Sequence, residues 1–143
     1  NCAVLKNLSY NCKKTKDLLI DRVGKPLTLF ERLKIGGNGS DKLIITDASN
    51  DIVELLKLDN NINQCNIEIR SNGIIVRFRA LLETYGLVIP FYKMVIYKGE
   101  KKIYSIYIDN QYIKFLADKK SIHSFIKKIN RLKSEYLNKT GFY

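Results

Sequence analysis

The sequence has no tryptophan, one histidine and two prolines in 143 residues, and only three cysteines, at positions 2, 12 and 65. This odd number of cysteines fits neither a metal-binding spacing nor a dense disulfide framework. We therefore expect free thiols that folding does not require, with a bond between Cys2 and Cys12 as the alternative. His123 has no cysteine motif beside it, so no nucleophile–base pair is supported, and we interpret it as a solvated surface residue.

Acidic residues are also few, 14 against 25 Lys and Arg, and they are scattered along the chain. No group of them has the spacing of a metal site or of an acid–base pair. The glycine-rich segment 36–40 lacks the Gly-x-x-x-x-Gly-Lys-Ser/Thr order of a phosphate loop, so we interpret it as a connector. These absences disfavour an enzyme, and we predict no catalytic residue, no cofactor and no metal.

Long hydrophobic runs are missing as well, since segments such as residues 86–91 are too short to cross a bilayer. The first six residues lack the apolar core of a signal peptide, which together with free thiols favours a cytoplasmic location. Hydrophobic residues still make up 45% of the chain, which is enough for a packed core. No linker interrupts residues 1–143, so we expect a single domain.

Positive charge is unevenly placed along the chain. The net charge is +11, and residues 70–143 hold 15 Lys and Arg against 5 Asp and Glu. Such an excess attracts nucleic acid, anionic lipid headgroups or an acidic partner, and it also serves plain solubility. Tyrosines interleaved with lysines on a sheet can stack bases while the lysines follow phosphates, and half of these rings should face the core. The tyrosines concerned are Tyr92, Tyr97, Tyr104, Tyr107 and Tyr112.

The clearest local pattern is a hairpin over residues 66–80. Apolar and polar residues alternate on both arms, and Asn72-Gly73 between them suits a tight turn with positive φ angles. Pro90 cannot donate to a sheet ladder, so it should mark an edge, a bulge or the start of a strand. Further extended segments are expected over residues 43–46, 86–98, 103–108 and 112–116.

A long helix is expected to end the chain over about residues 119–138, with Asp118 or Ser121 as its cap. Its apolar residues recur every three or four positions, so one stripe should pack on the sheet. This stripe includes Phe125, Ile129 and Leu132.

Three earlier segments are less clear. Pro26 suits the first position of a short helix, Thr28 and Glu31 have the spacing of a capping box, and Gly36-Gly37 would end the run. A strand through Leu27, Leu29 and Glu31 also fits. Residues 52–58 fit a helix or a strand, and residues 1–25 show no clear period.

Strands followed by one long amphipathic helix resemble pleckstrin-homology-like domains. Residues 66–132 look like the compact bacterial versions, with an Asn-Gly turn, the strand Val88-Ile89-Pro90-Phe91-Tyr92, a short meander and a helix starting at Ile122 to Ile126. The stretch Glu83 to Pro90 also resembles small uncharacterised bacterial proteins. The resemblance implies an α+β fold, in which a helix closes one end of a strongly bent antiparallel sheet of seven strands. Residues 66–138 support it best, and seven strands require residues 43–46 and 52–58 both to be extended.

Such domains bind phosphoinositides, peptides or proteins, and the fold alone does not select among these ligands. We expect a non-catalytic binding or interaction module with a protein partner or self-association. The alternative is an anion-binding domain for phosphoinositide-type headgroups or nucleic acid, which would bind through the basic second half. Its candidate site is Arg70, Arg77 and Arg79, whose spacing is similar to the basic-x-basic pattern of phosphoinositide-binding members. Guanidinium groups match phosphate oxygens, and in such a site they should lie together without carboxylate partners.

Overall fold

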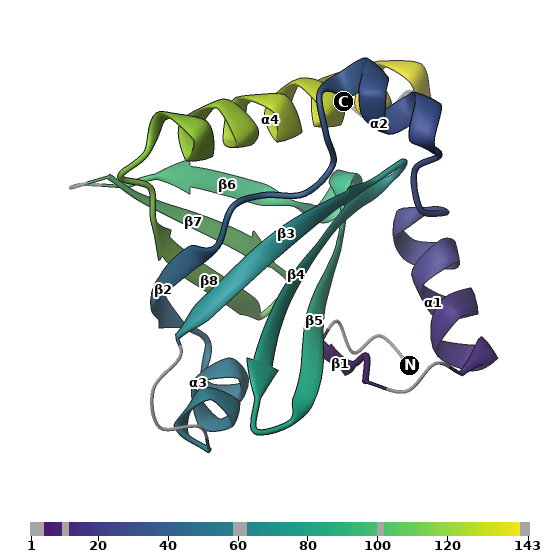
Figure 1. Cartoon of the computed structure of the whole chain (residues 1–143). Helices are drawn as coiled ribbons and strands as arrows, with labels where there is room; N and C mark the ends of the chain where they lie inside the picture. Colours follow the sequence, from purple (N-terminus) through teal and green to yellow (C-terminus); the bar gives the residue numbers. More distant parts are fainter. Residues whose placement is uncertain (1–4, 10–11, 59–62, 100–101, 141–143) are drawn as a thin grey trace.

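The computed structural model describes residues 5–9, 12–58, 63–99 and 102–140, and it shows an α+β fold with an antiparallel sheet and a C-terminal helix, as predicted (Figure 1). Within these residues the sheet has eight strands in the order β1-β5-β4-β3-β2-β8-β7-β6. The strands are β1 Leu5–Asn7, β2 Leu43–Ala48, β3 Gln64–Arg70, β4 Gly73–Ala80, β5 Glu83–Pro90, β6 Val95–Lys98, β7 Ile103–Ile108 and β8 Gln111–Leu116. The helices are α1 Lys13–Val23, α2 Leu29–Ile35, α3 Asn50–Lys57 and α4 Lys120–Thr140, with a 3-10 turn, η1, at Phe91–Lys93.

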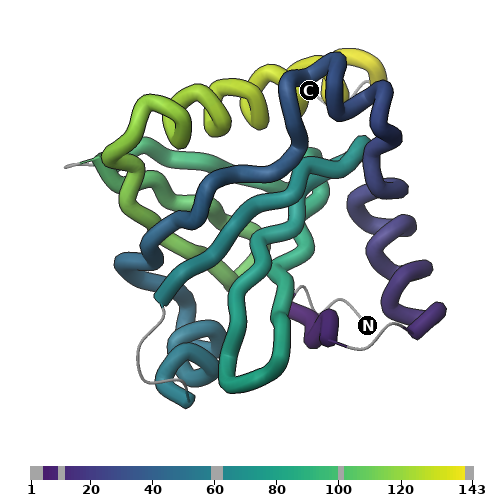
Figure 2. The backbone as a smooth tube through the Cα atoms, viewed as in Figure 1, coloured from purple at the N-terminus to yellow at the C-terminus, as the bar shows by residue number. Residues whose placement is uncertain are grey.

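The sheet curls around one hydrophobic core. Buried residues of β3–β5, such as Ile67 and Val76, belong to the same cluster as Ile106 and Phe115 of β7 and β8. In the backbone trace, β3–β5 cross in front of β6–β8, α4 lies across one end and α3 lies at the other (Figure 2). Helices from both ends therefore complete a core that the two arms of the sheet enclose.

The predicted hairpin over residues 66–80 is confirmed as β3 and β4, but its turn differs from the prediction. Arg70 pairs with Gly73, so Ser71 and Asn72 form the turn, and neither Asn72 nor Gly73 has a positive φ angle. Gly73 is instead required by close packing, because a Cβ there would lie 2.3 Å from the carbonyl oxygen of Ile89. The Asn-Gly pair thus located the turn correctly for a different physical reason.

The expected long strand over residues 86–98 is in fact two strands. β5 ends at Pro90, η1 reverses the chain, and β6 begins at Val95 on the opposite edge of the sheet. Phe91 and Met94 on either side of this break are each 1% exposed, so the apolar pattern continues through the turn. Because this break divides one expected strand into β5 and β6, seven strands are present besides β1 without any strand at residues 52–58.

Residues 52–58 belong to α3 and its C-cap rather than to a strand. Ile52 and Leu56, four residues apart, are 0% and 8% exposed in the core. Their spacing matches one helix face, which decides between the two readings of this segment.

Residues 1–25 contain β1 and α1, neither of which had a clear period. α1 buries only Leu19 and Val23, which pack on Ile75 and Val88 in a second, smaller cluster. Two buried residues in eleven leave too weak a pattern to predict a helix.

The three cysteines differ in their surroundings. Cys12, at the N-cap of α1, and Cys65, in the core, are both free thiols. Cys2 lies outside the described residues, and the free thiol of Cys12 does not form the alternative bond between them.

The predicted short helix is confirmed as α2, but it begins at Leu29 with Thr28 as its N-cap rather than at Pro26. Both bonds of the Thr28–Glu31 capping box are present, and Gly36 ends the helix in the left-handed conformation.

No helix among the described residues has the length and apolar character needed to cross a membrane.

Helix α4 packs as predicted, with Phe125 and Ile129 buried and Leu132 against the core. Its first hydrogen bonds run to the carbonyl of Lys119, which is therefore the N-cap, so the predicted caps Asp118 and Ser121 are wrong. Ser121 lies inside the helix and donates to Asp41 over 2.7 Å.

Candidate anion-binding site

The face of β3–β5 that points away from the core, here called the outer face, carries all three predicted arginines. Val76 and Phe78 of β4 enter the core, so Ile75, Arg77 and Arg79 project from the other side. α1 covers the part around Ile75. The part around Arg77 and Arg79 contains a surface pocket instead.

This pocket, here called the basic pocket, has a volume of about 450 Å³. Strand register brings its walls together: Arg79 pairs with Thr84 of β5, and Cys65 of β3 pairs with Leu43 of β2. Lys42 precedes that Leu43 and so joins the pocket. Its lining is Lys42, Gln64, Cys65, Asn66, Arg77, Phe78, Arg79, Leu81 and Thr84. Three cationic side chains thus meet amide and hydroxyl groups, and no carboxylate among the described residues lines the pocket.

Arg70 does not belong to the basic pocket. It is 8% exposed, and its Nε donates to Glu68 Oε2 over 2.9 Å while Nη1 donates to the carbonyl of Gly24 over 3.2 Å. Gly24 ends α1, so Arg70 fixes that helix to β3. Arg70, which was predicted as a site residue, therefore stabilises the fold in this structure.

Glu68 also accepts a hydrogen bond from Arg77 Nη1, so one carboxylate bridges two arginines. Two of the three predicted arginines therefore have a carboxylate partner, contrary to what an open anion site requires. Burial disfavours the charged carboxylate, but the hydrogen bonds and charges of Arg77 and Arg70 outweigh it, and the pKa of Glu68 lies below its usual value. Glu68 is thus ionised at neutral pH.

Arg79 and Lys42 are the more available cations of the pocket. Both are exposed, and among the described residues neither forms a salt bridge. The side chain of Arg77 is 29% exposed, and this residue lines the pocket while its Nη1 donates to Glu68. Two exposed cations and one positioned arginine can contact several oxygens of one phosphate group.

Nucleophilic or metal chemistry finds little support at this site. Burial raises the pKa of the Cys65 thiol to about 12, so the thiol stays protonated at neutral pH. His123 lies on α4, where its Nδ1 is 3.0 Å from the hydroxyl of Tyr104, and it is half-buried rather than solvated as predicted. In the part of the chain that the structure describes, no group of three His, Cys, Asp or Glu residues could hold a metal ion.

No family model, curated protein or solved structure matches the chain. Function is therefore inferred from the chemistry of the side chains.

The basic residues of the second half do not all converge on this pocket. Residues 118–140 hold seven Lys and Arg against two Asp and Glu, and α4 lies across the end of the molecule away from the β4–β5 turn (Figure 1). Lys128 donates to the carbonyls of Gly36 and Gly37, and Lys133 donates to that of Met94. Partial burial lowers the pKa of both lysines. Much of the charge excess thus lies on α4, where part of it stabilises the fold.

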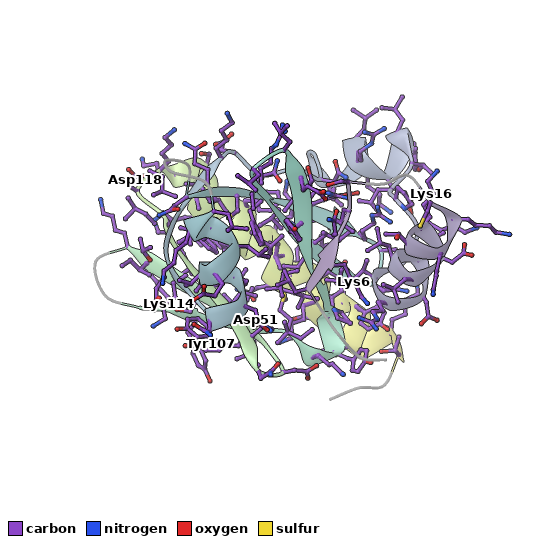
Figure 3. The ribbon with its side chains drawn as sticks, turned by 90° about the horizontal axis from the view of Figure 1, so that it is seen from below. Lys6, Lys16, Asp51, Tyr107, Lys114 and Asp118 are labelled. Atoms are coloured by element: carbon purple, nitrogen blue, oxygen red, sulfur yellow. The ribbon has the colours of Figure 1, made fainter. Side chains whose placement is uncertain are left out.

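A second surface feature, here called the tyrosine row, crosses the outer face of β6–β8. Tyr97 and Tyr107 have ring centroids 5.6 Å apart, and Tyr107 and Tyr112 have centroids 5.5 Å apart. Of the five tyrosines named from the sequence, all of them described here, Tyr104 alone is buried in the core, so fewer rings face inward than expected. In Figure 3, Tyr107 and Lys114 lie on the side of Asp51 of α3, away from Lys16 of α1.

Charges of both signs surround the tyrosine row. Lys114 lies 5.6 Å from the ring centroid of Tyr112, whose hydroxyl donates to Asp47 over 3.3 Å. Partial desolvation and the Asp47 carboxylate raise the pKa of Tyr112. Lys93 pairs with Asp109 over 3.6 Å. The tyrosine row therefore lacks the excess of positive charge found in the basic pocket.

Two features of the site lay beyond sequence reasoning. Lys42 reaches the pocket only through the pairing of β2 with β3, and no local pattern predicts this pairing. The burial of Arg70 depends on where α1 ends, and the sequence gives that helix no clear signal. Arg77 and Arg79 were found because strand alternation, a local signal, places both on one face.

Proposed function

We propose that the chain is a non-catalytic binding domain with pleckstrin-homology-like architecture, and that its basic pocket binds a phosphate-bearing anion. Seven adjacent strands in the order β5-β4-β3-β2-β8-β7-β6 support the architecture, together with α4 at one end of the curled sheet. The resemblance implies this number of strands and this helix. β1, α1, α2 and α3 are then additions to the common plan.

The observation that carries the anion-binding proposal is the convergence of Lys42, Arg77 and Arg79 on one pocket whose described lining has no carboxylate. Its volume of about 450 Å³ falls within the usual range for small-molecule sites. Asn66 and Thr84 add neutral donors beside the cations. A phosphate group uses all of these donors, whereas a neutral ligand would leave the cations unpaired.

Titration with inositol hexakisphosphate tests this proposal. The double variant Lys42→Ala/Arg79→Ala should bind at least about ten-fold more weakly than the wild type, because charge-assisted hydrogen bonds are lost. Lys120→Ala/Lys127→Ala is the matched control, since it removes the same charge from exposed positions on α4. Equal weakening in both double variants would mean that the field is diffuse, and the proposal would then be wrong.

A protein partner at the tyrosine row is the second candidate function. Tyr97 is 59% exposed and Val95 is 41% exposed, and both lie on β6 at an edge of the sheet. Large exposed aromatic side chains are typical of protein interfaces, and the mixed charges nearby disfavour nucleic acid at this surface. Sedimentation analysis of the wild type and of Tyr97→Ser would detect self-association through this row. A concentration-independent monomer would leave only a different protein as the partner.

A further inference from the structure

Two adjacent leucines project into solvent at the turn between β4 and β5. Leu81 is 55% exposed. Leu82 is 88% exposed, which is the largest fraction among the exposed large hydrophobic residues in the described part of the chain. A soluble domain gains nothing by keeping both side chains in water. The groups that surround this turn indicate which environment could bury the two side chains.

The backbone of the turn holds the leucines outward. Ala80 pairs with Glu83, so Leu81 and Leu82 alone form the loop, and Leu81 has a φ angle of +58°. A positive φ at the first of two turn residues matches a type II′ turn, where glycine is favoured. Leucine is therefore a poor choice for the turn itself, which points to a role for its side chain outside the fold.

The same turn borders the basic pocket. Leu81 lines the pocket, and Arg79 lies two residues before it. The carboxylate next to the turn, Glu83, accepts a hydrogen bond from Asn7 of β1. α3 lies at this end of the molecule as well, and its C-cap Leu58 is 55% exposed (Figure 1). Exposed apolar groups and available cations thus occupy one end, opposite α4.

We propose that this end of the molecule docks on the surface of an anionic phospholipid bilayer. Leu82 and Leu81 enter the boundary of the acyl chains while Lys42 and Arg79 contact lipid phosphates. A bilayer offers both chemistries in the right order, since phosphates lie just outside the hydrocarbon. A soluble anion would leave the leucines in water, and so would the polar backbone of a nucleic acid. The inference rests on the proposed function, because the headgroup phosphate is the anion of the basic pocket.

Neither signal alone gives stable membrane binding, but the two together do. Burying one leucine side chain changes the partition by roughly ten-fold or more. A single Lys or Arg near an anionic surface contributes roughly five-fold. Loss of either signal should therefore be measurable on vesicles, whereas only loss of the cations should weaken binding of a soluble anion.

The absence of tryptophan allows a direct test. Leu82→Trp introduces a single tryptophan whose emission should shift to the blue with vesicles of phosphatidylcholine and phosphatidylserine, and should not shift with inositol hexakisphosphate. Leu33→Trp is the matched control, because Leu33 is 72% exposed on α2 outside the basic pocket, and its emission should stay constant. Leu82→Ser should bind the vesicles about ten-fold more weakly, with unchanged affinity for inositol hexakisphosphate.

The outcomes separate this inference from the proposed function. Binding of inositol hexakisphosphate without any vesicle binding, or vesicle binding that Leu82→Ser leaves intact, would overturn the membrane inference alone. Equal binding to pure phosphatidylcholine vesicles would also overturn it, since headgroup charge would then play no part. Failure of the wild type to bind inositol hexakisphosphate would overturn the proposed function and the inference together.

Discussion

On the outer face of β3–β5, α1 covers the apolar part, and Arg70 and Arg77 share the Glu68 carboxylate. On β6–β8 the rings of Tyr97 and Tyr107 meet at the surface instead. Both halves have basic residues, but their lysines and arginines have different surroundings. Lys93 and Lys114 have an aspartate or a ring beside them, while Lys42 and Arg79 form no salt bridge among the described residues. Net charge alone does not locate a binding site, because the partners of each charge decide whether it is available.

The largest expected effect separates two arginines within the same half. Arg70→Ala should lower the free energy of unfolding by about 3–5 kcal/mol, because Glu68 loses a partner and the Gly24 carbonyl loses its donor. Arg79→Ala, on the same face, should change it by less than about 0.5 kcal/mol. Urea unfolding of both variants measures the difference. Equal costs would mean that Arg70 does not fix α1 to the sheet.

Removing apolar contacts should distinguish the covered half from the exposed half. Val23 is 0% exposed between α1 and the sheet, and Val23→Ala should cost about 2 kcal/mol through lost contacts and a residual cavity. Val95→Ala on β6 shortens the same side chain at 41% exposure and should cost less than about 1 kcal/mol. A similar cost at both positions, measured by thermal unfolding, would contradict the assignment of Val95 to the surface.

What the sequence predicted correctly depends on local periodicity. The hairpin of β3 and β4, the buried stripe of α4 and the capping box of α2 each arise within a few consecutive residues. The break after Pro90 was missed because Phe91 and Met94 keep the turn as apolar as a strand, and α1 was missed because only two of its residues are buried. The pocket was half predicted, since alternation fixes where Arg77 and Arg79 point but only tertiary pairing brings Lys42 beside them.

Acid should destabilise the covered half through Glu68. The pKa of Glu68 is lower in the folded state, so its contribution to stability is complete above the ordinary glutamate pKa of about 4.3 and is lost as the pH falls through the lower folded value. Glu68→Gln should therefore flatten the decline of unfolding free energy below about pH 4.3. Urea unfolding at several acid pH values checks this. An unchanged slope in the variant would show that other carboxylates account for the acid dependence.

The smallest expected effect comes from removing one positive charge from the exposed half. Lys114→Ala takes the same charge from the molecule as Arg79→Ala, and both side chains project from a strand on the outer face. If the basic pocket recognises the anion, Arg79→Ala should weaken binding of inositol hexakisphosphate several-fold, whereas Lys114→Ala should leave the affinity within about two-fold, because a screened surface charge contributes little at a distance. Titrations at low and at physiological salt keep the two contributions apart, since added salt suppresses the long-range field and leaves the direct contact. If Lys114→Ala weakened binding as much as Arg79→Ala at both salt concentrations, the difference between the two halves would not extend to anion binding.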